Sequence, residues 1–207
     1  MTAITLETQF EQFAKGLSDL GRQEAPFATA RAITITAEDA VDAVEKHIED
    51  VFERPTPFTK RAVGVRRASK ARPVATVYIK RIQAQYLGIQ ATGGQRRPRR
   101  RFLLDPVGAR LNKAGNIPRK ALDRMLAKPD HFLATIKGVR GVWRRYKSGR
   151  IKLMIALDET QTYRKRFYFE RTVEAVVARK LRRNFGREMS KAIAQARRRN
   201  IRKLVGS

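Results

Sequence analysis

Residues 132–157 read FLATIKGVRGVWRRYKSGRIKLMIAL. Large apolar, aromatic and β-branched residues dominate three short runs of this stretch, and such runs are typical of strands. Gly138 separates the first run from the second, and Lys147-Ser148-Gly149 separates the second from the third with the composition of a hairpin turn. We therefore predict an antiparallel β-meander with strands at residues 132–136, 139–146 and 150–157.

Two long helices are predicted on either side of this meander. Apolar side chains recur at three- and four-residue steps over residues 25–53 and again over residues 167–204, which is the spacing of one helix face. Pro26 suits the first turn of the earlier helix, and Pro55 with Pro57 would end it. These elements predict an α+β fold in which a small antiparallel sheet packs with long N-terminal and C-terminal helices.

Three shorter elements are predicted from local patterns. Residues 5–20 have the apolar spacing of a short amphipathic helix, and Gly21 follows where a C-cap glycine would lie. Residues 74–79 are predicted to form a strand. Residues 119–127 are predicted to form a short helix that ends before Pro129.

The chain is predicted to form a single α+β domain over residues 1–207, because no internal repeat and no clear linker divides it. Its charge is nevertheless uneven. The first 53 residues carry 4 basic and 11 acidic side chains, a net of −7, whereas residues 54–207 carry 42 basic and 8 acidic, a net of +34. We divide the domain into an acidic helical N-terminal part (1–53), a motif-bearing segment (54–130) with an extended basic arm (95–101), the β-meander (131–166) and a basic C-terminal helix (167–204).

The formal net charge of +27 predicts a negatively charged partner. A surface this basic repels itself unless a polyanion neutralises it, and nucleic acid gains binding free energy because each phosphate contact releases a counterion. The arm at residues 95–101 has five arginines and a proline, so it is expected to be exposed and to contact either phosphates or an acidic protein surface. The candidate DNA- or subunit-contacting residues are Arg96, Arg97, Arg99, Arg100, Arg101, Arg182, Arg183, Arg197, Arg198 and Arg199.

The acidic side chains of the 25–53 helix have three interpretations. They could fold onto the basic remainder of the same molecule, or pair with the basic face of a neighbouring copy, or remain solvated. A chain with one negative end and one positive body suits head-to-tail association, which closes into a ring if the rotation is right. The acidic residues are Glu38, Asp39, Asp42, Glu45, Glu49, Asp50 and Glu53.

Groups that carry catalysis are nearly absent from the sequence. The absence of cysteine excludes disulfides, thiolate zinc sites and a cysteine nucleophile. The two histidines, His47 and His131, are expected at the surface rather than as metal ligands. No zinc-protease, Walker or serine-hydrolase motif occurs, and no carboxylate spacing is typical of a nuclease. We therefore expect no enzymatic activity, no cofactor and no metal.

Two weaker signals have alternative interpretations. Gly93-Gly94 could cradle a phosphate through backbone N–H groups, or act as a hinge for the arm that follows, which is the reading we favour. Tyr163, Phe167, Tyr168 and Phe169 could stack on bases, but we expect them to anchor the start of the C-terminal helix in the core. No apolar stretch is long enough for a membrane span and no signal peptide is apparent, so a soluble protein is expected.

A series of short motifs occurs in order along the middle of the chain. They are Arg54-Pro55-Thr56-Pro57-Phe58-Thr59-Lys60-Arg61, Ala68-Ser69-Lys70, Ala75-Thr76-Val77-Tyr78-Ile79-Lys80, Tyr86-Leu87, Gly93-Gly94 and Lys113-Ala114-Gly115-Asn116-Ile117-Pro118. This progression, over roughly residues 25–200, resembles the minor tail protein Z and tail-completion group of tailed bacteriophages.

The resemblance implies a structural virion protein of the neck, made in the host cytoplasm. Such a protein would form a homo-oligomeric ring around the DNA channel, contact portal or connector and tail proteins, and lie near packaged DNA. It implies no catalytic residues. The alternative, based on charge alone, is a basic nucleic-acid-binding module outside any virus, such as a ribosome-associated or nucleoid protein; a phage nuclease or packaging enzyme would require metal-dependent cleavage and is not expected.

Overall fold

The computed structural model describes residues 3–6, 19–98 and 102–205. Their contacts divide the chain into two compact units. The helical unit comprises the described parts of Met1–Glu53, Pro57–Gly88 and Phe167–Ser207, and the hairpin unit comprises Arg54–Thr56 and Ile89–Arg166. The single domain expected from the sequence stays a prediction.

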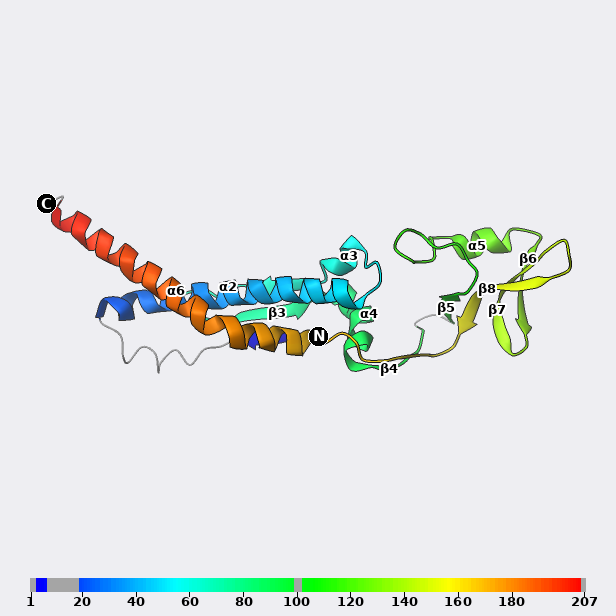
Figure 1. Cartoon of the computed structure of the whole chain (residues 1–207), viewed down its shortest axis with the longest axis horizontal. Coiled ribbons are helices and arrows are strands. Elements are labelled where there is room, and N and C mark those ends of the chain that lie inside the picture. Colours follow the sequence, from blue (N-terminus) through cyan, green and yellow to red (C-terminus); the bar gives the residue numbers. More distant parts are fainter. Residues whose placement is uncertain (1–2, 7–18, 99–101, 206–207) are drawn as a thin grey trace. The chain divides into compact units, whose positions relative to one another are not determined.

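The helical unit is built on two long antiparallel helices, α2 (Asp19–Val51) and α6 (Phe169–Val205), which lie side by side in Figure 1. Residues late in α2 meet the start of α6, since the Tyr168 N–H donates to Nε2 of His47 at 3.1 Å. Residues early in α2 meet the end of α6, where Glu24 forms an ion pair with Arg199. The buried face of α2 is rich in alanine, which allows close approach: Ala25, Ala28, Ala32, Ala37 and Ala40.

A small antiparallel sheet packs with these helices. Its strands are β1 (Ala3–Leu6), β3 (Ala75–Ile79) and β2 (Val63–Arg66), in the order β1-β3-β2. α2 contacts β2 and β3, and α6 contacts β1. The predicted α+β class, with long N-terminal and C-terminal helices packing a small sheet, is confirmed.

Two shorter helices complete this region. α3 (Pro57–Lys60) precedes β2, and α4 (Arg81–Thr92) follows β3. The amide of Gln83 donates to the Phe58 carbonyl at 3.2 Å, which ties α4 to α3. The longer segment of the hairpin unit, Ile89–Arg166, begins within α4.

The hairpin unit contains the predicted meander. Its four-stranded antiparallel sheet has the order β5-β8-β7-β6, and the three predicted strands are confirmed to within one residue at each end. The strands are β5 (Leu103–Pro106), β6 (His131–Ile136), β7 (Val139–Arg145) and β8 (Ile151–Asp158). A separate pair, β4 (Gly94–Arg96) with β9 (Gln161–Tyr163), and the helix α5 (Ala121–Leu126) complete the unit.

Both predicted hairpin turns are present. Lys137 and Gly138 have φ angles of 51° and 77°, which is the left-handed geometry of a two-residue turn that matches the strand twist. In the second turn the Tyr146 N–H donates to the Arg150 carbonyl at 2.8 Å, and Gly149 has a φ of 77°. Glycine adopts this conformation at little cost.

The predicted helix at residues 5–20 is wrong at its start, although its last two residues, Asp19 and Leu20, are helical as part of α2. Thr5 and Leu6 belong to β1, which pairs with β3, and residues 7–18 lie outside the described residues. Gly21 lies inside α2 rather than at a C-cap, and Pro26 lies beyond the first turn. Packing of the early α2 turns against Met189 and other α6 residues explains the longer helix, because tertiary contacts outweigh local propensity.

Replacing Gly141 by alanine is expected to lower the free energy of unfolding by about 1–3 kcal/mol. A Cβ atom at this buried position in β7 would lie 2.5 Å from both the Ile155 carbonyl oxygen and Leu153 Cδ1, so the strands would have to move apart. Urea denaturation would measure the loss. Gly186→Ala in α6 is the matched control: its Cβ would meet no atom within 4 Å, and alanine is the better helix former. Equal stability of the two variants would contradict the close strand approach.

Candidate polyanion-binding surface

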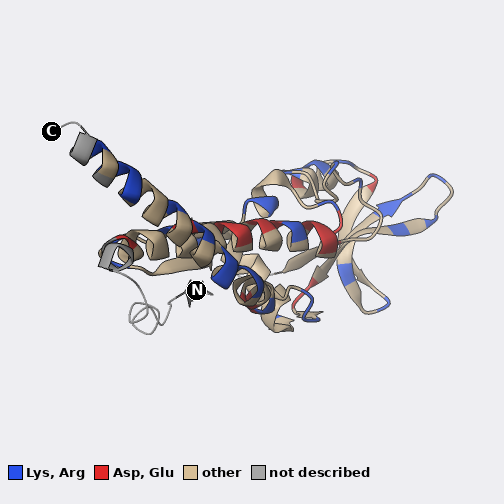
Figure 2. Ribbon diagram, turned by 60° about the vertical axis from the view of Figure 1, so that its left-hand side comes forward, with Lys and Arg blue, Asp and Glu red and all other residues tan. Residues whose placement is uncertain are grey.

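The outward face of α6 is a row of basic side chains. Buried residues such as Phe169, Val173 and Val176 recur at four- and three-residue steps, so the residues between them turn outward. Figure 2 shows the resulting bands of Lys and Arg along α6 and bands of Asp and Glu along α2. A helix that presents cations on one face can contact phosphates or carboxylates along its length.

Four of the predicted contact residues lie on this row. Arg182, Arg183, Arg197 and Arg198 are exposed, and none of them forms a salt bridge within the part of the chain that the structure describes. Arg199 differs, because it pairs with Glu24 inside the helical unit. We name Arg182, Arg183, Arg197 and Arg198 the α6 arginine row.

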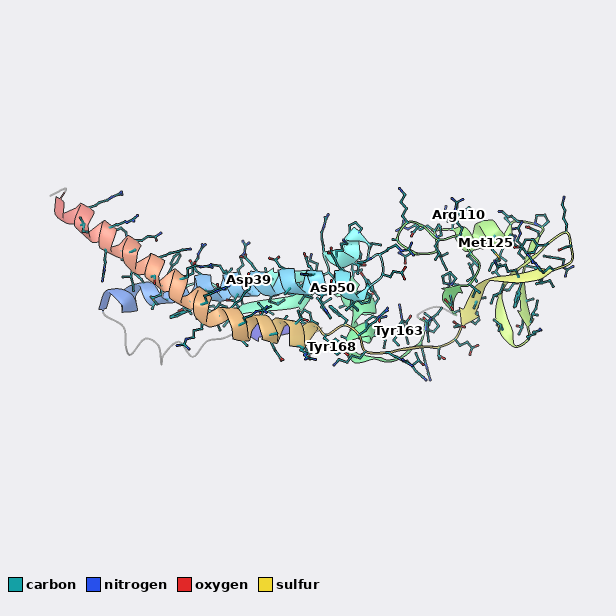
Figure 3. All side chains as sticks on the ribbon, in the orientation of Figure 1. Asp39, Asp50, Arg110, Met125, Tyr163 and Tyr168 are labelled. Carbon is teal, nitrogen blue, oxygen red and sulfur yellow. The ribbon has the colours of Figure 1, made fainter. Side chains whose placement is uncertain are left out.

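Polar contacts fix the register of α6 against α2 and so fix the direction of this row. Nζ of Lys180 donates to Asp39 Oδ1 at 2.8 Å. The buried amide of Asn184 donates to Thr36 Oγ1 at 3.0 Å and to Asp39 Oδ2 at 3.2 Å. Burial alone would raise the pKa of Asp39, but the hydrogen bonds from Lys180 and Asn184 and the nearby positive charges outweigh it and lower the pKa. Figure 3 labels Asp39 on α2.

The structure describes only part of the predicted basic arm. Arg96 is half-buried in β4, opposite Gln161 of β9, so the arm does not begin at residue 95 as expected. Backbone pairing with β9 explains this difference, because it satisfies the polar groups of residues 94–96. Arg97 is exposed, and Arg99, Arg100 and Arg101 lie outside the described residues.

Gly93 and Gly94 turn the chain from α4 into β4. Their φ angles are 73° and 106°, which few other residues adopt. The Gly93 N–H donates to the Ile89 carbonyl at 2.8 Å, so this N–H is already used at the helix end. The geometry supports a structural turn rather than a phosphate cradle.

The acidic side chains of α2 divide between two of the predicted interpretations. Folding onto the same molecule is confirmed for three of them: Glu38 pairs with Arg67 at 2.8 Å, Asp39 with Lys180 at 2.8 Å, and Glu49 with Lys60 at 2.7 Å. Asp42, Glu45 and Asp50 form no ion pair with any residue that the structure describes. These three remain available to solvent or to a neighbouring molecule.

Two of the four aromatic residues expected to anchor the start of α6, Phe167 and Phe169, do so. Phe167 and Phe169 are fully buried, and the Phe167 ring stacks on His47 with centroids 5.8 Å apart. His47 is half-buried and accepts the Tyr168 N–H, so it satisfies a backbone donor at the start of α6 that has no partner within the helix. Tyr168, labelled in Figure 3, is exposed, and Tyr163 is half-buried.

The surface position expected for His131 is wrong. Its ring is buried and its Nδ1 lies 2.6 Å from Asp130 Oδ1, while Arg144 Nε donates to the other Asp130 oxygen at 2.8 Å. Hydrogen bonds from His131 and Arg144 lower the pKa of Asp130, and the bond to Asp130 raises that of Arg144. Asp130, whose carboxylate makes the burial of His131 possible, is its neighbour in the sequence. Arg144, which also binds Asp130, comes from the next strand.

A set of arginine–aromatic contacts in and beside the four-stranded sheet was not predicted from the sequence. The guanidinium carbons of Arg144 and Arg150 lie 4.8 and 5.0 Å from the centroid of the Tyr146 ring. Arg145 lies 5.3 Å from the Phe132 ring, and Arg140 lies 4.6 Å from the Phe102 ring. The available signal was the run Arg144-Arg145-Tyr146 directly before a tight turn.

Among the described residues, no group of three or more His, Asp or Glu side chains is placed to hold a metal ion. None of the helices in the same ranges combines the length and the apolar character needed to cross a membrane. Comparison of the chain with family models, with curated proteins and with solved structures finds no match. The function must therefore be argued from the residues themselves.

Proposed function

We propose that this chain is a structural protein of a tailed-phage neck, which acts in tail completion between the head connector and the tail. The ordered motifs from Arg54 to Pro118 support the phage assignment by resemblance. In this proposal several copies form a ring around the DNA channel, and the ring contacts portal or connector proteins and tail proteins. The chain serves as a scaffold and performs no catalysis.

One observation carries the ring. The same helical unit carries charges of both signs that form no salt bridge among the described residues: the α6 arginine row, and on α2 the exposed Asp42 and Asp50 with the half-buried Glu45. Because these positive and negative side chains form no ion pairs with one another, they can form ion pairs with the oppositely charged side chains of the next copy. Such a contact joins two different surfaces, and a head-to-tail contact closes into a ring when its rotation allows. Complementary charges also set the register between copies.

Charge reversal on the α6 arginine row is expected to weaken association between copies roughly 100-fold. The variant is Arg182→Glu with Arg197→Glu; Arg183 is left intact because its charge helps to lower the pKa of Asp39. Sedimentation velocity and negative-stain microscopy would follow ring formation. Arg110→Glu with Lys113→Glu changes the net charge equally at exposed positions of the hairpin unit, and is expected to leave rings intact.

A second variant tests the pairing itself. Asp42→Arg with Asp50→Arg should also abolish rings, because two arginine faces would then meet. Mixing this protein with the Arg182→Glu, Arg197→Glu protein should restore association, since each reversed face finds a partner of opposite sign. A wild-type chain that stays monomeric alone and with portal and tail proteins would refute the neck role. Sub-micromolar duplex binding by that monomer would favour the alternative of a free nucleic-acid-binding module.

A further inference from the structure

The β7–β8 hairpin extends beyond the strands that flank it. β6 begins at His131, which lies opposite Arg144, and β5 pairs with β8 only from Ile155 onward. The Arg145 N–H still donates to the Asp130 carbonyl on one side, so the two-stranded tip comprises residues 146–151 and is closed by the hydrogen bond from the Tyr146 N–H to the Arg150 carbonyl. A two-stranded ribbon of this kind is narrow enough for the major groove of DNA.

The tip carries a dense positive charge. Residues 144–152 contain five cations and no acidic side chain: Arg144, Arg145, Lys147, Arg150 and Lys152. Only Arg144 is paired with a carboxylate, that of Asp130, in the part of the chain described by the structure. All the others are exposed. The tip is thus an unneutralised cationic surface rather than one face of an internal ion-pair network.

Aromatic rings hold three of these guanidinium groups in place. Tyr146 has Arg144 and Arg150 over its ring, at 4.8 and 5.0 Å, and Arg145 lies over Phe132 at 5.3 Å. A stacked guanidinium can still donate its in-plane N–H groups to phosphate oxygens, although Nε of Arg144 already donates to Asp130. Stacking also restricts long side chains before binding, so less conformational entropy is lost when a phosphate is bound.

We propose that the tip of the β7–β8 hairpin binds the phosphate backbone of duplex DNA. This proposal rests on the proposed function in one respect: the polyanion is taken to be the DNA that passes through the channel of the ring. In this proposal the cations of the tip contact phosphates rather than guanine edges, and the remaining Ser148, Gly149 and Ile151 offer no bidentate contact to a base pair. Binding through phosphates is independent of sequence and serves to hold or guide DNA rather than to select a site.

The test uses the full-length chain and a short DNA duplex of mixed sequence, with binding followed by fluorescence anisotropy over a range of salt concentrations. Arg145→Ser, Lys147→Ser and Arg150→Ser together should reduce the slope of log K against log salt by about 3, close to one unit for each lost phosphate contact. The matched control is Arg110→Ser, Lys113→Ser and Arg119→Ser, three exposed cations of the same unit. This control should keep the wild-type slope. Circular dichroism would confirm that both variants fold.

A conservative variant separates charge from stacking. Arg145→Lys with Arg150→Lys keeps the charge but removes the planar groups, so the affinity should fall several-fold while the salt slope stays near that of the wild type. An unchanged slope in the serine variant, or an equal loss in its control, would overturn the hairpin site. Ring formation is measured separately by sedimentation. If the chain forms rings and the serine variant binds DNA as the wild type does, the hairpin site is refuted but the ring is not. If the chain stays monomeric and the serine variant loses DNA binding, the ring is refuted but the hairpin site is not.

Discussion

Replacing Phe167 by alanine is expected to lower the free energy of unfolding by about 3–5 kcal/mol. Phe167 is fully buried and lies among three rings, with centroid distances of 5.8 Å to His47, 6.1 Å to Phe52 and 6.2 Å to Phe169. Truncation would remove buried apolar area and leave a cavity that these rings cannot close without moving α2 or α6. Both terms destabilise the folded chain.

Urea denaturation followed by circular dichroism would measure this loss. Phe58→Ala is the matched control, because it deletes the same atoms from a side chain that is 53% exposed. The control is expected to change stability by less than about 0.5 kcal/mol. Equal effects of the two substitutions would show that Phe167 does not anchor the helical unit.

The packing of Phe167 also matters for the proposed function, because it helps to fix the position of α6. Phe167 lies where the chain returns from the hairpin unit to the helical unit, one residue before Tyr168, whose N–H is held by His47. Loosening this point would free the first turn of α6. The α6 arginine row depends on the register of that helix, so a variant that folds but frays here should also associate less well.

The elements that the sequence predicts best are those with a long, regular pattern. The helical spacing over residues 25–53 and 167–204 extends through many turns, so it indicates α2 and α6 even where the ends are misplaced. The meander was equally clear because Gly138 and Gly149 mark both turns with positive φ angles. Each signal is local, and each is repeated within its own element.

Elements that depend on distant partners were not predicted. β2 has only four residues, Val63–Arg66, and exists through pairing with β3. Among the apolar residues spaced along 167–204, Val177 and Leu181 are only half-buried, whereas the polar Asn184 is almost completely buried. Thr36 and Asp39 make that burial possible, and nothing near Asn184 in the sequence indicates that they would be its partners.

The candidate contact surfaces also differ in whether they depend on local sequence or on distant partners. The α6 arginine row could be predicted because helical periodicity determines which residues face outward. The contacts of Arg145 with Phe132 and of Arg140 with Phe102 could not, because the sheet register decides which of these residues come together. Composition indicated a basic protein, but the sheet register decides which arginines have ordered side chains.

Replacing Glu188 by alanine at neutral pH is expected to lower the free energy of unfolding by about 2 kcal/mol, because a buried carboxylate that accepts charged hydrogen bonds is lost while its cations, which are about half exposed, regain water. Its side chain is only 6% exposed, and it lies between α2 and α6 with three cations around it. Lys191 Nζ lies 2.9 Å and Arg187 Nε 3.3 Å from Oε1, and Arg31 Nε lies 3.6 Å from Oε2. Removal of the carboxylate would leave these cations facing one another.

The same carboxylate predicts how stability depends on pH. Burial alone would raise the pKa of Glu188, but the hydrogen bond from Lys191 and the charges of Lys191, Arg31 and Arg187 outweigh it and lower the pKa. The unfolded pKa is about 4.3, so this contribution is fully present above that pH and is lost as the pH falls through the lower folded value. Glu188→Gln has no such charge to lose.

The difference in unfolding free energy between wild type and Glu188→Gln should therefore shrink as the pH falls below about 4.3. Denaturation curves at a series of pH values would measure it, and the parallel contribution of Asp39 cancels because both proteins contain it. Glu174→Gln, at an exposed position of α6, should stay within about 0.5 kcal/mol of wild type. A Glu188 difference that does not change with pH would mean that the carboxylate stabilises the helix pair through packing and neutral hydrogen bonds rather than through its charge.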